Sequence, residues 1–262
     1  MMALRTAATG MAAQDLNVDV ISNNIANMNT IGYKKQRAEF EDLLYLDIQR
    51  AGAQSSDTGT IVPTGIQVGA GVKTGSVYSI TTQGSPTITG NQYDLAINGK
   101  GYFQILQPSG EIAYTRAGNF SVNATGQLVT TDGYLVQPEI TIPQGTTAVT
   151  ISPSGQVQAT IPGTTTPTVA GQLTLATFFN ESGLEATGGN LFLQTAASGP
   201  PTLGNPNANG VGALIQGSIE SSNVDPVTEI TALIVAQRAY EMNSKVITSA
   251  DQMLSTTNAM KQ

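Results

Sequence analysis

The chain has 262 residues and a formal net charge of −7, and it contains neither histidine nor cysteine. The usual acid–base group at neutral pH, a thiolate nucleophile, a disulfide and the common zinc ligands are therefore excluded. Charged residues make up only 11% of the chain, and no Lys or Arg lies between Arg116 and Arg238. This middle part would repel a phosphate backbone, so we expect no nucleic-acid binding.

Residues 3–27 are predicted to form one long helix. An apolar residue recurs every seven positions, and further apolar residues lie three positions later: Leu4, Met11, Val18, Ile21, Ile25 and Met28. Such a seam needs a partner helix. The helix is expected to end in the Asn-rich stretch before Gly32, because Asn and Gly tolerate left-handed backbone conformations.

Residues 31–74 are predicted to contain a short helix followed by an extended arm. Four apolar residues fit one helical face: Phe40, Leu43, Leu44 and Ile48. From residue 51 to residue 74 the composition changes to Gly, Ser, Thr and Gln with Pro63, which is typical of an extended segment rather than a helix.

Residues 75–224 are predicted to form an irregular β-rich domain. Short alternating stretches are separated by turns, and Asn98-Gly99 offers a hairpin turn between the strands around Ile97 and Phe103. A Gly-containing turn phrase recurs three times, centred on Gly110, Gly126 and Gly155, where glycine can supply a positive φ. The spacing of these phrases is too irregular for a solenoid or a propeller.

The last helix is predicted to start at Pro226, with Asp225 as its cap, and to reach Ala259. Its apolar heptad consists of Leu233, Tyr240, Ile247 and Leu254. Small or polar residues lie three positions later: Ala236, Asn243, Ala250 and Thr257. Both terminal helices are weakly apolar, so each depends on a partner for stability.

These observations predict an α+β fold with a discontinuous helical coiled-coil domain, residues 1–30 and 225–262, around the central β-rich domain. The ten apolar heptad residues of the two helices are the predicted subunit-interface residues. The alternative is an antiparallel coiled coil inside one subunit. We expect both to hold, so that the two ends pair with each other and then with neighbouring copies.

No catalytic, cofactor-binding or metal-binding residues are predicted. Residues 69–74 resemble a phosphate loop, but Ile66 stands where its first glycine is required. Gly99-Lys100-Gly101 is more simply a turn, and no pair of carboxylates is singled out by its spacing. No run of about 18 apolar residues predicts a membrane span. Asp15 and Asp19 interrupt the N-terminal stretch, which therefore does not resemble a secretory signal peptide.

Residues 22–35, SNNIANMNTIGYKK, resemble the N-terminal signature of the bacterial flagellar basal-body rod and hook proteins. Residues 221–254 resemble their C-terminal signature, and residues 93–105 and 114–138 resemble their core segments. Within this family, residues 37–45, 51–56 and 63–72 are most similar to the distal-rod members.

The resemblance implies a non-catalytic structural subunit without a cofactor. It would polymerise into a helical tube that crosses the periplasm to the outer membrane and transmits motor torque to the hook. The implied partners are further copies of the chain, the proximal-rod and hook proteins, and the surrounding basal-body rings. Export would use the flagellum's own type III apparatus, without a cleaved signal peptide. The alternatives are a proximal-rod paralogue, a β-rich glycan-binding module, and a hydrolase.

Overall fold

The computed structural model describes residues 2–50, 52, 64–163 and 166–260. The chain forms two compact units. The helical unit takes the described residues of Met1–Ile25, Gln36–Tyr78 and Pro226–Gln262, and the β unit takes those of Ala26–Lys35 and Ser79–Asp225. Two long helices near the ends of the chain and a strand-rich region between them confirm the predicted α+β class.

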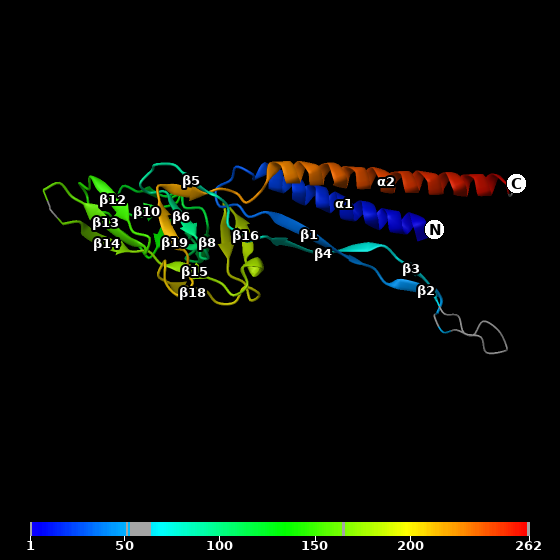
Figure 1. The fold of residues 1–262 in the computed structure, drawn as a ribbon, viewed down its shortest axis with the longest axis horizontal. Coiled ribbons are helices and arrows are strands. Elements are labelled where there is room, and N and C mark those ends of the chain that lie inside the picture. The colour runs from blue at the N-terminus through cyan, green and yellow to red at the C-terminus, as the bar shows by residue number, and fades with distance from the viewer. Residues whose placement is uncertain (1, 51, 53–63, 164–165, 261–262) are drawn as a thin grey trace. The chain divides into compact units, whose positions relative to one another are not determined.

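The helical unit is built on two antiparallel helices, α1 (Met2–Ala26) and α2 (Pro226–Ala259). Both helices are confirmed, α1 to within one residue at each end and α2 at both ends. They lie side by side in Figure 1, with the two chain ends at the same end of the pair. The Nδ2 of Asn24, near the end of α1, donates a hydrogen bond of 3.1 Å to Glu229 in the first turn of α2. The antiparallel alternative is therefore present within one subunit.

The short helix expected between Phe40 and Ile48 is wrong, because this segment forms strands. Strand β1 (Gln36–Asp42) pairs with β4 (Val72–Ser79), and β2 (Tyr45–Gln49) pairs with β3 (Ile66–Gly69). From Gln36 to Glu41, exposure alternates residue by residue, which is the two-residue period of a strand. Of the predicted extended arm, residues 51 and 53–63 lie outside the described residues.

The β unit contains a seven-stranded antiparallel sheet with the order β16-β17-β8-β7-β11-β10-β9. Its strands are β7 (Phe103–Leu106), β8 (Ile112–Thr115), β9 (Ser121–Val122), β10 (Leu128–Val129), β11 (Leu135–Gln137), β16 (Glu185–Gly188) and β17 (Leu191–Leu193). A second sheet has three strands, β12 (Ala148–Ile151), β13 (Gln156–Thr160) and β14 (Thr168–Gln172).

Three strand pairs and one short helix complete the described part of the β unit. The pairs are β6 (Leu95–Asn98) with β19 (Ala213–Gln216), β5 (Pro86–Ile88) with β20 (Ser218–Glu220), and β15 (Leu175–Thr177) with β18 (Thr202–Gly204). The 3-10 helix η1 spans Glu181–Gly183. The core lies among these sheets, and its innermost members are Leu95, Ile97, Phe103, Ile105, Leu173 and Leu175.

The three predicted glycine turns are confirmed. Gly110, Gly126 and Gly155 have φ values of 86°, 84° and 86°, and Gly110 lies in the turn between β7 and β8. The hairpin expected across Asn98-Gly99 is wrong, since β6 pairs with β19 and not with β7. The buried Arg116 explains the difference, because its Nη1 donates to the carbonyl oxygens of both Gly99 and Gly101. These carbonyl groups are thereby directed at Arg116. No described helix has the length and hydropathy needed to cross a bilayer.

Candidate assembly surface

The contact between α1 and α2 is made by a row of small and polar residues. On α2, Glu229, Ala236 and Ala250 are buried and Asn243 is half-buried, so that buried positions recur every seven residues. On α1, a Cβ at Gly10 would lie 2.9 Å from Nδ2 of Asn243. Small side chains therefore let the two backbones approach closely, since the distance between packed helices is set by the side chains at their contact.

The predicted interface residues lie mostly beside this contact rather than in it. Of the ten, Ile21 is buried, and Met28, Tyr240 and Leu254 are exposed. The remaining six are half-buried: Leu4, Met11, Val18, Ile25, Leu233 and Ile247. The apolar heptad therefore borders the intramolecular contact, and its exposed part can still contact another molecule.

Sequence reasoning missed a further set of apolar residues on the outer faces of α2. These side chains are between 46% and 73% exposed: Val227, Ile230, Ile234, Val235, Met242, Val246 and Met253. A helix that packs against one partner has a single apolar stripe and a polar opposite face. The signal was present in the sequence, because α2 carries more apolar positions than one stripe can hold.

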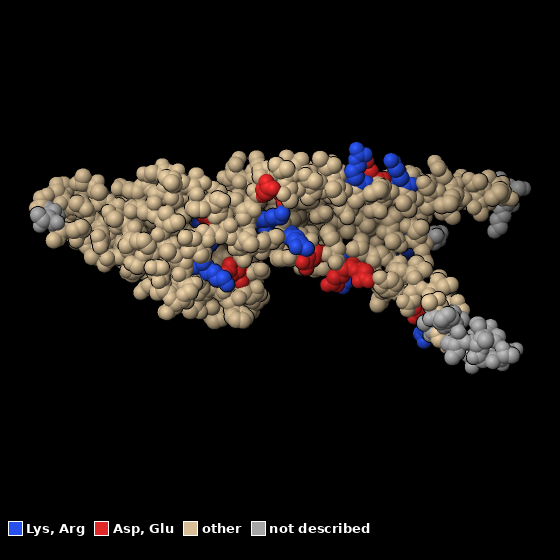
Figure 2. All heavy atoms as spheres, in the orientation of Figure 1, with Lys and Arg blue, Asp and Glu red and all other residues tan. Residues whose placement is uncertain are grey.

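Two grooves run along the helix pair. The larger has a volume of about 590 Å³, and its lining includes Gln14, Asn17, Val235 and Ala239. The smaller has a volume of about 300 Å³ and is lined by Asp15, Val18, Gln237, Tyr240 and Glu241. The face drawn in Figure 2 carries few charged side chains. The exposed apolar side chains of α2, together with these grooves, form a surface that is suited to packing against further helices.

The buried Asn24 fixes the relative position of α1, β1 and α2. Its Nδ2 donates to the carbonyl oxygen of Gln36 as well as to Glu229, and its Oδ1 accepts from the backbone N–H of Gln36 at 2.8 Å. Asn24 is 1% exposed. Because a buried amide needs partners, this residue ties the end of α1 to the first strand and to the start of α2.

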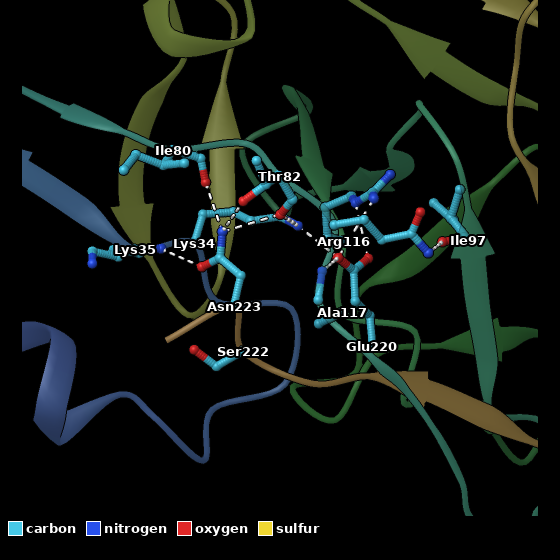
Figure 3. Close-up of polar contacts among 12 residues, drawn as sticks. Lys34, Lys35, Ile80, Thr82, Ile97, Arg116, Ala117, Glu220, Ser222 and Asn223 are labelled. Carbon is cyan, nitrogen blue, oxygen red and sulfur yellow. Dashed lines mark hydrogen bonds and ion pairs between the residues drawn. The ribbon is translucent and has the colours of Figure 1, made fainter. Parts of the chain in front are cut away.

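A buried ion cluster lies in the β unit, where Glu220 of β20 contacts two cations (Figure 3). Its Oε1 lies 2.6 Å from Nζ of Lys34 and accepts from the backbone N–H of Gly84, and its Oε2 lies 3.0 Å from Nε of Arg116. The three side chains are at most 4% exposed. Removal from water lowers the pKa of Lys34, and the neighbouring Glu220 only partly opposes this shift.

Asn223 strengthens the same region. Its side chain accepts from the backbone N–H of Lys35 and donates to the carbonyl oxygens of Ile80 and Thr82. Asn223 and the ion cluster together join residues 34–35, 80–84 and 220–223. These segments lie next to three of the four points at which the chain passes between the β unit and the helical unit.

Three family models match the chain. "Flagella basal body rod protein" matches residues 4–34, "Flagellar hook protein FlgE/F/G D1 domain" matches residues 96–159, and "Flagellar basal body rod FlgEFG protein C-terminal" matches residues 215–260. The first match covers most of α1, and the last covers α2 together with Glu220 and Asn223. The middle match lies entirely within the β unit.

Curated relatives match over nearly the whole chain. The flagellar basal-body rod protein FlgG of Caulobacter vibrioides is 67% identical over 261 residues, which is 100% of both chains. The protein of the same name from Bacillus subtilis is 40% identical over 96% of both chains. The flagellar basal-body rod protein FlgF of Caulobacter vibrioides is 35% identical over 90% of this chain and 88% of its own.

Proposed function

This chain belongs to the family of flagellar basal-body rod proteins, and from that premise we propose how it assembles and acts. It is a structural subunit of the distal rod. Many copies stack into a helical tube, with α1 and α2 of each copy packed against the same helices of its neighbours. The identity of 67% to a FlgG protein, against 35% to a FlgF protein of the same organism, favours the distal rod over a proximal-rod paralogue.

The proposed assembly rests on the apolar outer surface of α2. A monomer gains nothing from exposing Val235 to 63% and Met242 to 61%, whereas a neighbouring helix would bury them. Contacts between unlike faces of identical subunits generate an open helical filament when the rotation does not close. Of the ten predicted interface residues, Val18 and Tyr240 line the smaller groove, and we include the exposed parts of the other helix residues in this proposed surface.

The further parts of the proposal follow from the family. The tube crosses the periplasm towards the outer membrane and carries motor torque to the hook. Its ends join the proximal-rod and hook proteins, and the basal-body rings surround it. The chain is exported through the flagellum's own apparatus without a cleaved signal peptide. The buried ion cluster supports torque transfer, because it joins segments next to three of the four points at which the chain passes into the helical unit.

The test places a charge on the outer surface of α2. Val235→Asp would bury an unpaired carboxylate between neighbouring subunits, at a cost of several kcal/mol. This variant should no longer assemble, as measured by sedimentation and electron micrographs. Its monomer should keep the thermal transition of the parent. Lys245→Asp is the matched control, because it places the same side chain at an exposed, already charged position of α2. Normal tubes from Val235→Asp would overturn the proposed helix packing.

A further inference from the structure

Lys100 is held outward on a rigid turn of the β unit. Gly99 and Gly101 on either side have φ values of 115° and 141°, and Arg116 binds the carbonyl oxygens of both. The backbone N–H of Gly212 donates to the carbonyl oxygen of Lys100 at 2.7 Å. The side chain of Lys100 is exposed and makes no ion pair with any described residue. The fold thus presents the Lys100 side chain to the surroundings from a fixed backbone turn.

A polar pocket of about 190 Å³ lies elsewhere on the β unit, and its lining includes Thr115, Asn119, Asp132 and Asn190. The hydroxyl group of Thr115 donates to the carbonyl oxygen of Asn190. The amide of Asn119 donates to Thr131, and the amide of Asn190 donates to the carbonyl oxygen of Ile31. These hydrogen bonds fix the walls of the pocket, so it is preorganised.

Several acceptor groups of the pocket, among them its one carboxylate, are left without a donor among the described residues. The carboxylate of Asp132 and the amide oxygens of Asn119 and Asn190 accept no hydrogen bond from the described residues. Carboxylate and amide oxygens can only accept, whereas an ammonium group carries three donors and no acceptor. The pocket therefore suits a donor-rich cation.

The turn and the pocket lie on different sides of the short segment around Arg116. The guanidinium group of Arg116 reaches the glycine carbonyls of the Lys100 turn, while its chain neighbours Thr115 and Ala117 line the pocket. Among the described residues, Lys100 and Asp132 make no ion pair with each other within the subunit. They can meet when identical subunits stack head to tail.

We propose that Lys100 of one subunit inserts into the Asp132 pocket of the next subunit. The inference rests on the proposed polymerisation and names one of its lateral contacts. The β unit has four basic residues, Lys34, Lys35, Lys100 and Arg116, against eight acidic ones. Lys34 and Arg116 are buried in the ion cluster and Lys35 is half-buried, which leaves Lys100 as the exposed cation among the described residues of this unit. Copies with this acidic surplus repel each other, and a lysine in an acceptor pocket offsets that repulsion and fixes the register.

Zero-length cross-linking of the unmodified chain tests the contact. A carbodiimide joins an ammonium group to a carboxylate only when the two touch. Assembled tubes made from a mixture of isotope-labelled and unlabelled subunits should yield a cross-linked pair of peptides, one with Lys100 and one with Asp132. In part of these pairs one peptide is labelled and the other is unlabelled, which shows that they come from different subunits. Soluble monomer should not yield these mixed pairs. The exposed Lys73–Glu41 pair, 2.8 Å apart in the helical unit, serves as the internal control for the reaction in both samples.

Two results would overturn the proposed contact. If the tubes yield the Lys73–Glu41 peptide and no mixed Lys100–Asp132 peptide, the contact does not exist. If the chain forms no sedimentable tubes, and its basal bodies isolated from cells also lack the mixed peptide, the proposal fails with its premise. The presence or absence of tubes in micrographs distinguishes these two failures.

Charge exchange gives an independent measurement. Lys100→Glu or Asp132→Lys should raise the critical concentration for assembly about fivefold or more, because each places like charges in contact. The double variant should return the critical concentration to within about twofold of the parent. Glu111→Lys is the matched control, since Glu111 is exposed and lies outside the pocket. A double variant that is as impaired as both single changes combined would refute the pairing.

Discussion

Glu220 is 1% exposed and faces Lys34 and Arg116, so the charge balance of the cluster depends on it. Glu220→Gln leaves two buried cations without their carboxylate and should lower the free energy of unfolding by about 3 kcal/mol or more. Lys34→Met should cost less, because Arg116 then still pairs with Glu220. Chemical denaturation measures both effects. Glu185→Gln, at an exposed site, is the control, and equal midpoints for it and Glu220→Gln would contradict the structural role of the cluster.

Tyr102 links stability to alkaline pH. Burial, and then the neighbouring Glu181, which accepts a hydrogen bond of 3.1 Å from the hydroxyl group, raise the pKa of Tyr102. A folded pKa above the unfolded value of about 10 gives stability that is fully present below about pH 10 and is lost as the pH rises further.

Tyr102→Phe tests this linkage. The variant should be less stable than the parent near pH 8, by about 1 kcal/mol for the lost hydrogen bond. It should also lose less stability between about pH 8 and about pH 11. Burial also raises the pKa of Tyr114, but that group is common to both proteins and cancels in the comparison. Urea denaturation at the two pH values gives the result, and identical pH dependence of the two proteins would exclude the linkage.

At this scale the sequence predicted backbone features better than side-chain clusters. The positive φ of Gly110 and Gly126 followed from the turn phrases, because local chemistry determines a turn. The ion cluster was not predicted, since its members are 104 and 186 residues apart and share no local pattern. The scarcity of basic residues in the middle of the chain was the one signal that could have directed attention to Arg116.

Among the elements, the close contact of α1 and α2 depends on small side chains. Gly10→Leu would place a bulky group where even a Cβ lies 2.9 Å from Asn243, and should force the helices apart. We expect hydrogen exchange of α1 and α2 to become fast while exchange in the β unit stays slow. Ala12→Leu is the control, because Ala12 is exposed on the same helix. Slow exchange throughout Gly10→Leu would show that the contact tolerates bulk.

The long helices were predictable and the strands beside them were not. Caps and heptads are local signals, so α2 could be placed from Pro226 to Ala259. The segment from Phe40 to Ile48 shows a helical spacing of apolar residues by coincidence. Its strands exist because β1 pairs with β4 and β2 with β3. The β2–β3 partners lie 17 to 24 positions apart, and β1 and β4 lie at least 30 positions apart, so a local period does not reveal them. In the same way, the heptads predicted a helix seam. They did not predict that the row of small and polar residues on α2 would be more deeply buried than the apolar row.

For the whole molecule, we propose that the segment of Leu44 and the β2–β3 pair stiffens the assembled tube. Leu44 and Ile48 are 87% and 67% exposed, which is unusual for apolar residues unless a neighbouring subunit covers them. Leu44→Ser combined with Ile48→Ser should leave polymerisation intact but yield curved or flexible tubes in electron micrographs. Gln49→Ser changes an exposed polar residue of β2 and is the control. Straight tubes from the double variant would favour a simple linker.

The bond between Asn24 and Glu229 spans 205 positions of the chain, and this has a consequence for the time course of biosynthesis. A ribosome completes α1 before the β unit and α2 after it. Until α2 emerges, α1 lacks its partner helix, whereas the hydrogen bonds of Gly32 and Lys35 to residues 220 and 223 can already bring the two chain segments together. Closing so long a loop is entropically costly from an open chain and far less costly from a folded one. The folded β unit therefore lowers the entropic cost of bringing α2 to α1, and the helix pair is the late step in the folding of a subunit.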